Sequence, residues 1–431
     1  MAKLRQLYYV SLAALMLAIR TWAQLGDVDV AAAATRAQQA QQAGDYRRAA
    51  EIYEKLLAGS PNSAELLSNV GVMRHLAGED DVALRSFAKA LRLNPKLLTP
   101  NLFSGLALLR LGRAREALPY LEHAHSLNDS VLTNVALAKA HVALRDFRRA
   151  NEDYYRATRQ DPQHAESWFG LGVTYRNLLN AVALRIGKSA PDSPAVKAPL
   201  ADFSAPVGRG VMLAREKAAM QHPADLDAAV RLAQSYQSLA LDALARAVQL
   251  EPNSARTHLA LAEAQAESQN LLSAIPEYES AIRAAPQSEA GYLGLATAYW
   301  RSGDSDRALG PLQQALRLAP GDPEANAIMA DLLVHSGEFT QASSYATKAL
   351  KGNPDLAIAR VALAKIDLGQ NRPADAVAEL QQTLDADSDG TYHYILYRAL
   401  KQLGRSREAS EALRIYRARH ALFRKDAADT H

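Results

Sequence analysis

The chain has 431 residues, no cysteine, and 49 basic against 46 acidic residues. The absence of cysteine excludes disulfides, thiolate metal sites and thiol nucleophiles. The near balance of charge argues against a nucleic-acid binder, which carries a surplus of lysine and arginine for phosphates. Hydrophobic residues make up 48% of the chain and aromatic residues only 6%. Much of the apolar content is alanine, the strongest helix former, so the composition favours an all-helical protein.

The N-terminal segment has the layout of an export signal. Lys3 and Arg5 precede an apolar run over residues 7–19, and a small-x-small pattern ends at Ala23. This order is that of a secretory signal peptide, and the run is shorter than the roughly 20 residues that span a bilayer. We therefore expect residues 1–23 to be a signal peptide and the protein to be periplasmic or extracellular, with no stable membrane span after cleavage. The alternative is an uncleaved N-terminal anchor.

Prolines, alanines and glycines recur with a period of about 34 residues. The period predicts repeats of helix, turn and helix, in which proline ends the second helix and glycine takes the turn. One such hairpin cannot bury its apolar stripe alone, whereas stacked hairpins form a superhelical solenoid. The prolines in register are Pro61, Pro95, Pro252, Pro286, Pro320 and Pro354, and the turn glycines are Gly44, Gly78, Gly112, Gly303, Gly337 and Gly404.

One repeat carries a recognisable signature, Trp168-x2-Leu171-Gly172-x2-Tyr175. This pattern resembles the tetratricopeptide repeat, whose unit of about 34 residues continues with a small residue, an aromatic residue and a terminal proline. The resemblance implies an all-α, right-handed α-solenoid, here of about ten repeats.

In chain order, we expect four repeats over 24–164, an interrupted repeat over 165–254, and five repeats over 255–431, of which the last is a cap. The repeats start near residues 30, 64, 98, 131, 165, 255, 289, 323, 357 and 390. In the repeats that start near 98 and 357, Asp129 and Ser388 stand in place of the terminal proline.

The interrupted repeat exceeds the others by more than the length of a whole repeat. Apolar stripes extend both of its helices, which predicts a projecting helical hairpin. Residues 187–210 hold four prolines and three glycines and predict a loop, followed by a short helix over 211–221. Such a loop is either a tolerated surface insertion or a segment that contacts a partner.

The sequence contains no catalytic or cofactor-binding constellation. Gly187-Lys188-Ser189 has the end of a phosphate-binding loop, but Val182 occupies the position that requires the first glycine. His123 and His125 are two residues apart, which places them on different faces of a helix. We therefore predict no enzyme, no cofactor and no metal site.

In the tetratricopeptide family, the first helix of each repeat lines a concave groove that holds peptides or helices. The resemblance implies a polypeptide partner here, in a largely apolar groove centred on Phe103, Phe169 and Trp300. The alternative is that these aromatic side chains fill gaps between neighbouring repeats. The candidate groove residues are Asn69, Phe103, Leu106, Lys139, Phe169, Arg176 and Trp300.

These features predict a non-enzymatic scaffold or adaptor that binds a protein or peptide, in envelope assembly or export. Two alternatives remain open at this point. The chain could be an accessory subunit of an envelope enzyme such as a glycosyltransferase, or it could carry a small apolar ligand.

Overall fold

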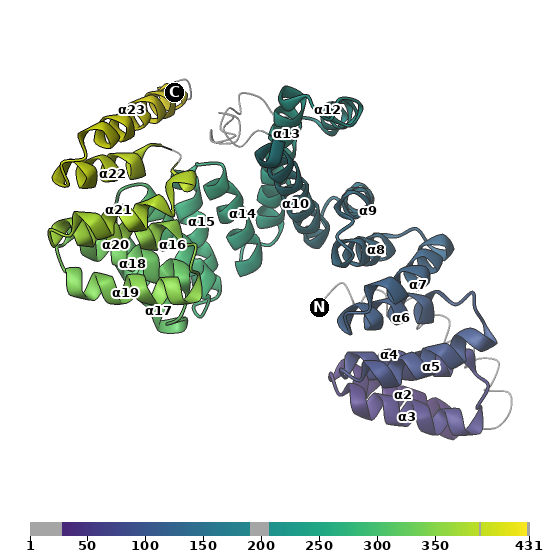
Figure 1. Ribbon diagram of the computed structural model, residues 1–431. Helices are drawn as coiled ribbons and strands as arrows, with labels where there is room; N and C mark the ends of the chain where they lie inside the picture. Colours follow the sequence, from purple (N-terminus) through teal and green to yellow (C-terminus); the bar gives the residue numbers. More distant parts are fainter. Residues whose placement is uncertain (1–27, 190–206, 388, 429–431) are drawn as a thin grey trace. The chain divides into compact units, whose positions relative to one another are not determined.

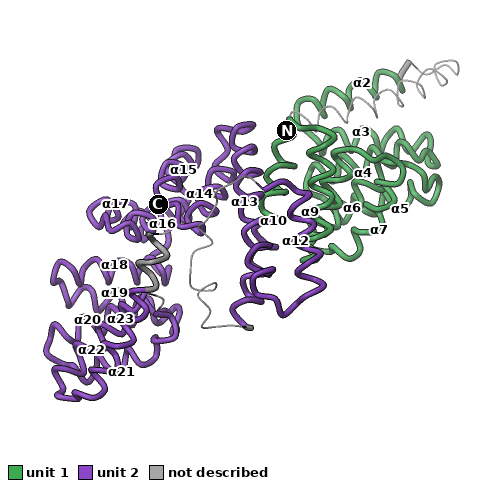
Figure 2. Tube along the Cα trace, turned by 90° about the horizontal axis from the view of Figure 1, so that it is seen from above, with its two compact units in different colours: residues 1–174 green, residues 175–431 purple. Residues whose placement is uncertain are grey.

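The computed structural model describes residues 28–189, 207–387 and 389–428. The expected signal peptide and most of the expected loop at 187–210 lie outside the described residues. The chain forms two compact units, Met1–Thr174 (unit 1) and Tyr175–His431 (unit 2), which are shown in two colours in Figure 2. Within the described ranges every regular element is a helix (Figure 1), as the all-α prediction requires.

Unit 1 is a series of helical hairpins that ends inside a long helix. Each pair consists of a first and a second helix of one repeat. The helices are α2 (Val28–Gln42), α3 (Tyr46–Gly59), α4 (Ala64–Leu76), α5 (Asp80–Leu93), α6 (Leu98–Arg110), α7 (Ala114–Leu127), α8 (Val131–Ala143), α9 (Phe147–Gln160) and the start of α10 (Ala165–Ser189).

Unit 2 continues with the rest of α10 and further hairpins. In the hairpin of α20 and α21, the second helix is short and is followed by the 3-10 turn η2. The elements are α12 (Arg209–Gln221), α13 (Leu226–Leu250), α14 (Ala255–Glu267), α15 (Leu271–Ala284), α16 (Glu289–Arg301), α17 (Ser305–Leu318), α18 (Pro323–His335), α19 (Phe339–Gly352), α20 (Ala357–Gly369), α21 (Pro373–Gln381), η2 (Leu384–Ala386), α22 (Thr391–Gln402) and α23 (Ser406–Ala428).

The expected turn glycines adopt the backbone conformation that calls for glycine. Gly78, for example, has a φ of 86° between α4 and α5, a region that residues with a Cβ rarely adopt. Where the repeat lacks this glycine, Arg145, Gln269 and Asn371 take the same left-handed conformation with φ near 60°. The turn geometry is therefore kept in the repeats whose sequence departs from the pattern.

Glycines inside the first helices allow close packing against the second helices. A Cβ on Gly71 of α4 would lie 2.9 Å from Cζ of Phe87 on α5, and closer still to two other atoms of that ring. The corresponding glycine of the next repeat, Gly105, faces Leu121 in the same way. Phe87 and Leu121 are fully buried, so these glycines make room for large side chains of the interior.

In most repeats, the fourth residue forms a hydrogen bond to the repeat before it. In the family signature this position holds tryptophan, and Trp168 donates its Nε1 hydrogen to the carbonyl oxygen of Pro162 at 2.9 Å. Other side chains at the fourth position donate to the same carbonyl of the preceding repeat. These contacts are Asn101 to Pro95, His258 to Pro252, Asn326 to Pro320 and Arg360 to Pro354, at 2.9 to 3.1 Å. The proline and the fourth residue thus form one structural device, because a proline carbonyl at a helix end has no helical donor.

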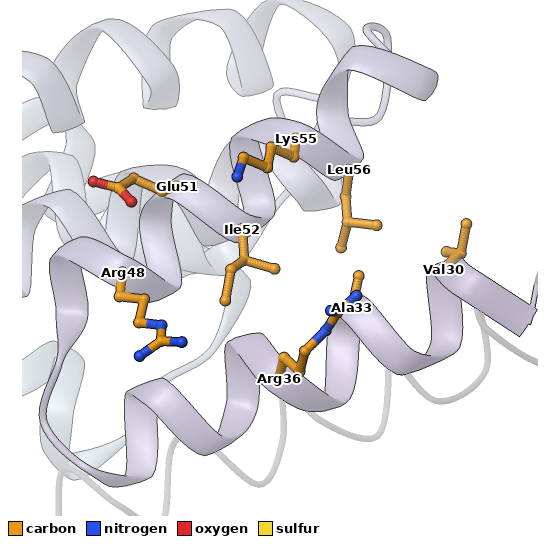
Figure 3. A pocket seen from close by; sticks show the side chains of 8 residues that line it. All are labelled: Val30, Ala33, Arg36, Arg48, Glu51, Ile52, Lys55 and Leu56. Atoms are coloured by element: carbon orange, nitrogen blue, oxygen red, sulfur yellow. The ribbon is translucent and has the colours of Figure 1, made fainter.

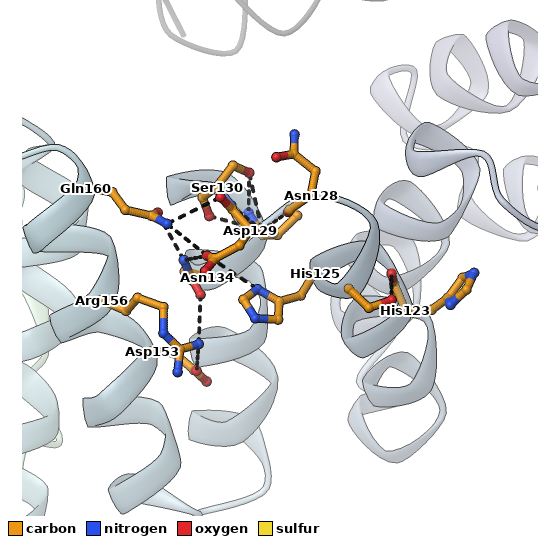
Figure 4. Close-up of polar contacts among 11 residues, drawn as sticks. His123, His125, Asn128, Asp129, Ser130, Asn134, Asp153, Arg156 and Gln160 are labelled. Carbon is orange, nitrogen blue, oxygen red and sulfur yellow. Dashed lines mark hydrogen bonds and ion pairs between the residues drawn. The ribbon is translucent and has the colours of Figure 1, made fainter.

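An aspartate takes over this role where the proline is missing. Asp129 stands in the proline position, and its Oδ1 accepts hydrogen bonds from the fourth residue Asn134 at 2.7 Å and from Gln160 at 2.8 Å (Figure 4). In the repeat that starts near 357, where the proline is also missing, Asp387 pairs with His393, the fourth residue of the next repeat, at 2.5 Å. The carboxylate therefore replaces the carbonyl acceptor, and these repeat boundaries stay defined.

The two helices that the sequence predicts to be overlong, α10 and α13, each contain 25 residues. In unit 2 they pack together through Tyr175 and Tyr236, whose ring centroids are 6.1 Å apart. α10 extends to Ser189 and α12 begins at Arg209, so both ends of the predicted loop 187–210 are helical. α12 is also built into unit 2, because its Met212 is 2% exposed and Arg209 donates to the hydroxyl of Tyr175.

Candidate functional site

The first helices of neighbouring repeats contact one another and form a row in each unit. In unit 1 these contacts join α4 to α6 and α6 to α8. In unit 2 they join α14 to α16, α16 to α18, α18 to α20, and α20 to α22. We call each series the first-helix row. The row places side chains from successive repeats side by side, as a surface for an extended or helical partner requires.

In unit 1 the predicted groove residues differ in how much surface they present. Asn69 on α4, Leu106 on α6 and Phe169 on α10 are half-buried. Phe103 is only 6% exposed and packs against the buried ring of Phe87, with ring centroids 6.4 Å apart. Phe103 thus fills the gap between neighbouring repeats, which is the alternative that the sequence left open, and its side chain offers little surface to a partner.

The charged groove residue of unit 1 is engaged within the protein. Lys139 of α8 lies 2.7 Å from the carboxylate of Glu166 at the start of α10, and both side chains are partly exposed. An ion pair of this exposure contributes about 0–1 kcal/mol. The pair does, however, neutralise the charge of Lys139, so a partner at this row would meet an ammonium group that already has a carboxylate beside it.

Arg176 stands at the beginning of unit 2 and contacts two carboxylates of α14. Its guanidinium lies 3.0 Å from Glu263 and 2.6 Å from Glu267. Burial acts to lower the pKa of Arg176, but the hydrogen bonds and charges of the two carboxylates outweigh it and raise that pKa. Arg176 therefore works as a fixed cation between α10 and α14.

Trp300 begins a polar chain that crosses three first helices of unit 2. Its indole Nε1 donates to Oδ2 of Asp331 on α18 at 2.9 Å. The other oxygen of Asp331 lies 2.6 Å from Nζ of Lys365 on α20. Trp300 also packs against the hydrophobic core of α14 to α18 while remaining half-buried. An aromatic ring with one polar edge, anchored on a row of helices, is the kind of side chain that carries binding energy at protein interfaces.

Five of the predicted groove residues lie in unit 1, and Arg176 and Trp300 lie in unit 2. What the sequence interpretation did not foresee is that their charges are matched by neighbouring repeats. Asp331 and Lys365 are opposite charges one repeat period apart along the chain, and this spacing was the available signal. Residues in the same register of stacked repeats become neighbours, so opposite charges there predict a pair.

The described ranges offer neither a metal site nor a membrane span. No group of three or more metal-ligating side chains comes together in them. None of the helices there is both long and apolar enough to cross a membrane. His123, one of the two neighbouring histidines, contacts the carbonyl oxygen of Pro95 at 3.2 Å. His125 approaches Asp129 at 3.7 Å (Figure 4).

Comparison with protein families settles the relationship that the repeat pattern indicates. Two family models described as tetratricopeptide repeat match the chain, one over residues 266–332 and 333–402, the other over 35–97, 135–184 and 238–289. The chain belongs to the tetratricopeptide-repeat family. No curated protein sequence matches it.

Among solved structures, the chain is similar to several repeat proteins at low identity. A chain of the APC/C hetero-tetramer Cut9–Hcn1 is 15% identical, with 90% of this chain and 87% of that chain covered and a TM-score of 0.40. A tetratricopeptide repeat protein from Parabacteroides merdae is 16% identical, with 70% and 98% covered and a TM-score of 0.42. YrrB, described as a tetratricopeptide repeat protein with an unusual peptide-binding site, is 15% identical, with 56% and 96% covered and a TM-score of 0.37.

Proposed function

We propose that this protein is a non-enzymatic scaffold that binds a polypeptide partner along its first-helix rows. The family fold is that of a protein-interaction scaffold, which is the general part of the proposal. The specific part rests on one observation: Trp300 stands half-buried on the row of unit 2, held in place by Asp331. A pre-oriented aromatic side chain loses little entropy when a partner packs against it.

The pairing of charges along the rows indicates which kind of partner segment fits. Lys139, Arg176 and Lys365 each contact a carboxylate of a neighbouring repeat. A strongly charged peptide would have to break these pairs and would leave partly buried charges without partners. We therefore propose an apolar or amphipathic helical segment as the ligand of the rows.

The proposed place of action is outside the cytoplasm, in envelope assembly or export. The support for it is the signal-like sequence over residues 1–23. Cell fractionation followed by N-terminal sequencing tests this part. A periplasmic or secreted chain that begins at Gln24 would support it, and a cytoplasmic chain that begins at Met1 would contradict it.

The binding proposal is tested by affinity capture with residues 24–431 as bait, from a detergent-solubilised envelope of the source organism. A Trp300→Ala bait should lose the partner. The matched control is Leu272→Ala, because Leu272 is an apolar residue of unit 2 that is 83% exposed on the second helix α15. If both variants capture the same proteins as the wild type, the first-helix row is not the binding surface.

The role of the insertion is better tested by substitution than by deletion. Removal of 187–225 would take away Met212, which is buried in unit 2, and would disturb the fold. Val211, Leu213 and Met220 are the large exposed apolar residues of α12. Their replacement by serine should leave folding unchanged and reduce capture only if α12 contacts the partner.

A further inference from the structure

The first hairpin of unit 1 contains a hollow with a volume of 520 Å³, between α2 and α3 (Figure 3). Its apolar part is formed by Val30 and Ala33 of α2 and by Ile52 and Leu56 of α3. All four are half-buried, so part of their apolar surface remains exposed to solvent. A volume of this size is in the range of ligand-binding cavities, which hold about 300–1,000 Å³.

One residue that lines the hollow, Ala33, departs from the repeat pattern. Ala33 is the fourth residue of its repeat, the position at which the later repeats carry larger side chains. The equivalent residue of the next repeat, Leu67, is 4% exposed. In five other repeats the fourth side chain donates to the proline carbonyl of the repeat before it, as Trp168 does to Pro162. The methyl group of Ala33 can neither fill this space nor donate a hydrogen bond.

Those five contacts also show what normally lies against this part of a repeat. The preceding repeat supplies the end of its second helix and the proline turn that follows, with the turn carbonyl directed at the fourth residue. In the described part of unit 1, no helix precedes α2. In the first hairpin, no described helix lies on the surface that receives a helix end in the later repeats.

Charge indicates what kind of helix end fits. Three cations, Arg36, Arg48 and Lys55, line the hollow together with a single carboxylate, Glu51 (Figure 3). None of the three cationic groups forms an ion pair with another described residue, and all three side chains are exposed. The C-terminus of a helix carries unsatisfied carbonyl groups and a partial negative charge. Acidic side chains in its last turn would add to the attraction.

We propose that the first hairpin binds the acidic C-terminal end of an amphipathic helix from a polypeptide partner. The apolar residues of that helix would pack on Ile52 and Leu56, and its carboxylates and last carbonyls would face Arg36 and Arg48. The inference deepens the proposed scaffold function and rests on it, but it concerns a surface distinct from the first-helix row of unit 2. The bound helix end would take the place that the second helix of a preceding repeat occupies in the later repeats.

Two other occupants fit the charge less well. Residues 1–23 contain three bases and no acid, and so have the same sign of charge as the hollow. Residues 24–27 carry one acid but are too few to supply a helical ligand. The last helix of a second copy, α23, carries Arg414, Arg417 and Arg419, which likewise gives it a basic C-terminal half. Like charges brought together at a contact oppose association.

The test measures the anisotropy of a fluorescein-labelled peptide on addition of protein. The peptide has about 16 residues, because shorter isolated helices are marginally stable in water. It carries leucines at i, i+3 and i+7, three glutamates in its last turn and a free C-terminal carboxylate. Its control has glutamines in place of the glutamates and a C-terminal amide. We expect the full chain and residues 24–431 to bind the acidic peptide, at least tenfold more tightly than the control peptide, with affinity that falls as salt is raised.

The decisive variant is Ala33→Leu, which places in the first hairpin the side chain that the second repeat already carries at this position. It fills the hollow without disturbing the repeat pattern, and an unchanged melting temperature would verify the fold. We expect at least a tenfold loss of peptide affinity. Arg36→Gln with Arg48→Gln should also weaken binding severalfold. Arg317→Gln, which changes an exposed cation on the second helix α17, should leave the affinity unchanged.

Each contrary result has a distinct meaning. Equal affinity of wild type and Ala33→Leu would overturn the proposal, as would equal affinity for the two peptides. Peptide binding that is lost in Trp300→Ala but kept in Ala33→Leu would also overturn it, while the scaffold function would stand. Binding to residues 24–431 but not to the full chain would assign the hollow to residues 1–23, and self-association abolished by Ala33→Leu would assign it to a second copy.

Discussion

The contact between Gly71 and Phe87 gives a quantitative test of how the repeat interior is built. Replacement of Gly71 by alanine has two opposing effects. Alanine is favoured over glycine in a helix interior by about 1 kcal/mol. The new Cβ, however, would lie 2.5 Å from Cδ1 of Phe87, whereas ordinary carbon contacts lie at about 3.5–4.0 Å. The buried ring of Phe87 cannot move away without opening space elsewhere.

Overpacking of a well-packed core costs about 1–3 kcal/mol, and the contact here is severe enough for the upper part of that range. After subtraction of the gain in helix propensity, we expect Gly71→Ala to destabilise the hairpin of α4 and α5 by about 1–2 kcal/mol. Another repeat shows a compatible pair of residues at these two positions. In the hairpin of α16 and α17 they are Ala296 and Leu312, both fully buried. Gly71→Ala combined with Phe87→Leu should therefore cost less than the sum of the single changes, with a coupling of about 1 kcal/mol or more.

Hydrogen exchange is the suitable assay, since long repeat arrays do not unfold in a single step. Exchange of the amides of α4 and α5 reports the opening free energy of this hairpin, and α18 and α19 serve as an internal reference. The reasoning would be refuted if Gly71→Ala slowed exchange, because helix propensity would then outweigh the contact. Strict additivity in the double variant would refute the pairing of the two positions.

Three further predictions concern hydrogen bonds and protonation. Trp168→Phe removes the donor to Pro162 and should speed amide exchange at the start of α10 by an amount equivalent to about 1 kcal/mol. Burial lowers the pKa of His75 in spite of its hydrogen bond to Asp80, so the folded state favours the neutral histidine. The stability that this preference contributes is complete above pH 6.5 and is lost as the pH falls below that value. The melting temperature of His75→Gln should therefore depend less on pH between 6.5 and 5 than that of the wild type. Burial raises the pKa of Tyr278 to about 12. An absorbance titration should therefore show a tyrosine ionisation near pH 12 that is absent in Tyr278→Phe. The stability of the wild type should fall as the pH rises from 10 towards 12.

Much of this fold follows from the periodic residues alone. Prolines at regular intervals predict the repeat length, and Gly78 and its counterparts predict the turns, because both residue types restrict or free the backbone locally. The apolar stripes of the two long helices, α10 and α13, follow from the same local reasoning. A pattern that acts through a residue's own backbone or its helix neighbours is readable without coordinates.

Contacts between repeats are where the tertiary structure was needed. Phe103 and Trp300 look alike as aromatic residues of first helices, yet Phe103 is buried against Phe87 whereas Trp300 keeps a partly exposed ring bonded to Asp331. The difference depends on which side chains the adjoining helices bring to the contact. The hollow beside Ala33 likewise depends on the contacts between helices. An alanine in a helix is unremarkable in the sequence, and only the structure shows the space that a larger side chain would fill. Local conformation is encoded residue by residue, but burial and charge pairing are properties of the stacked repeats together.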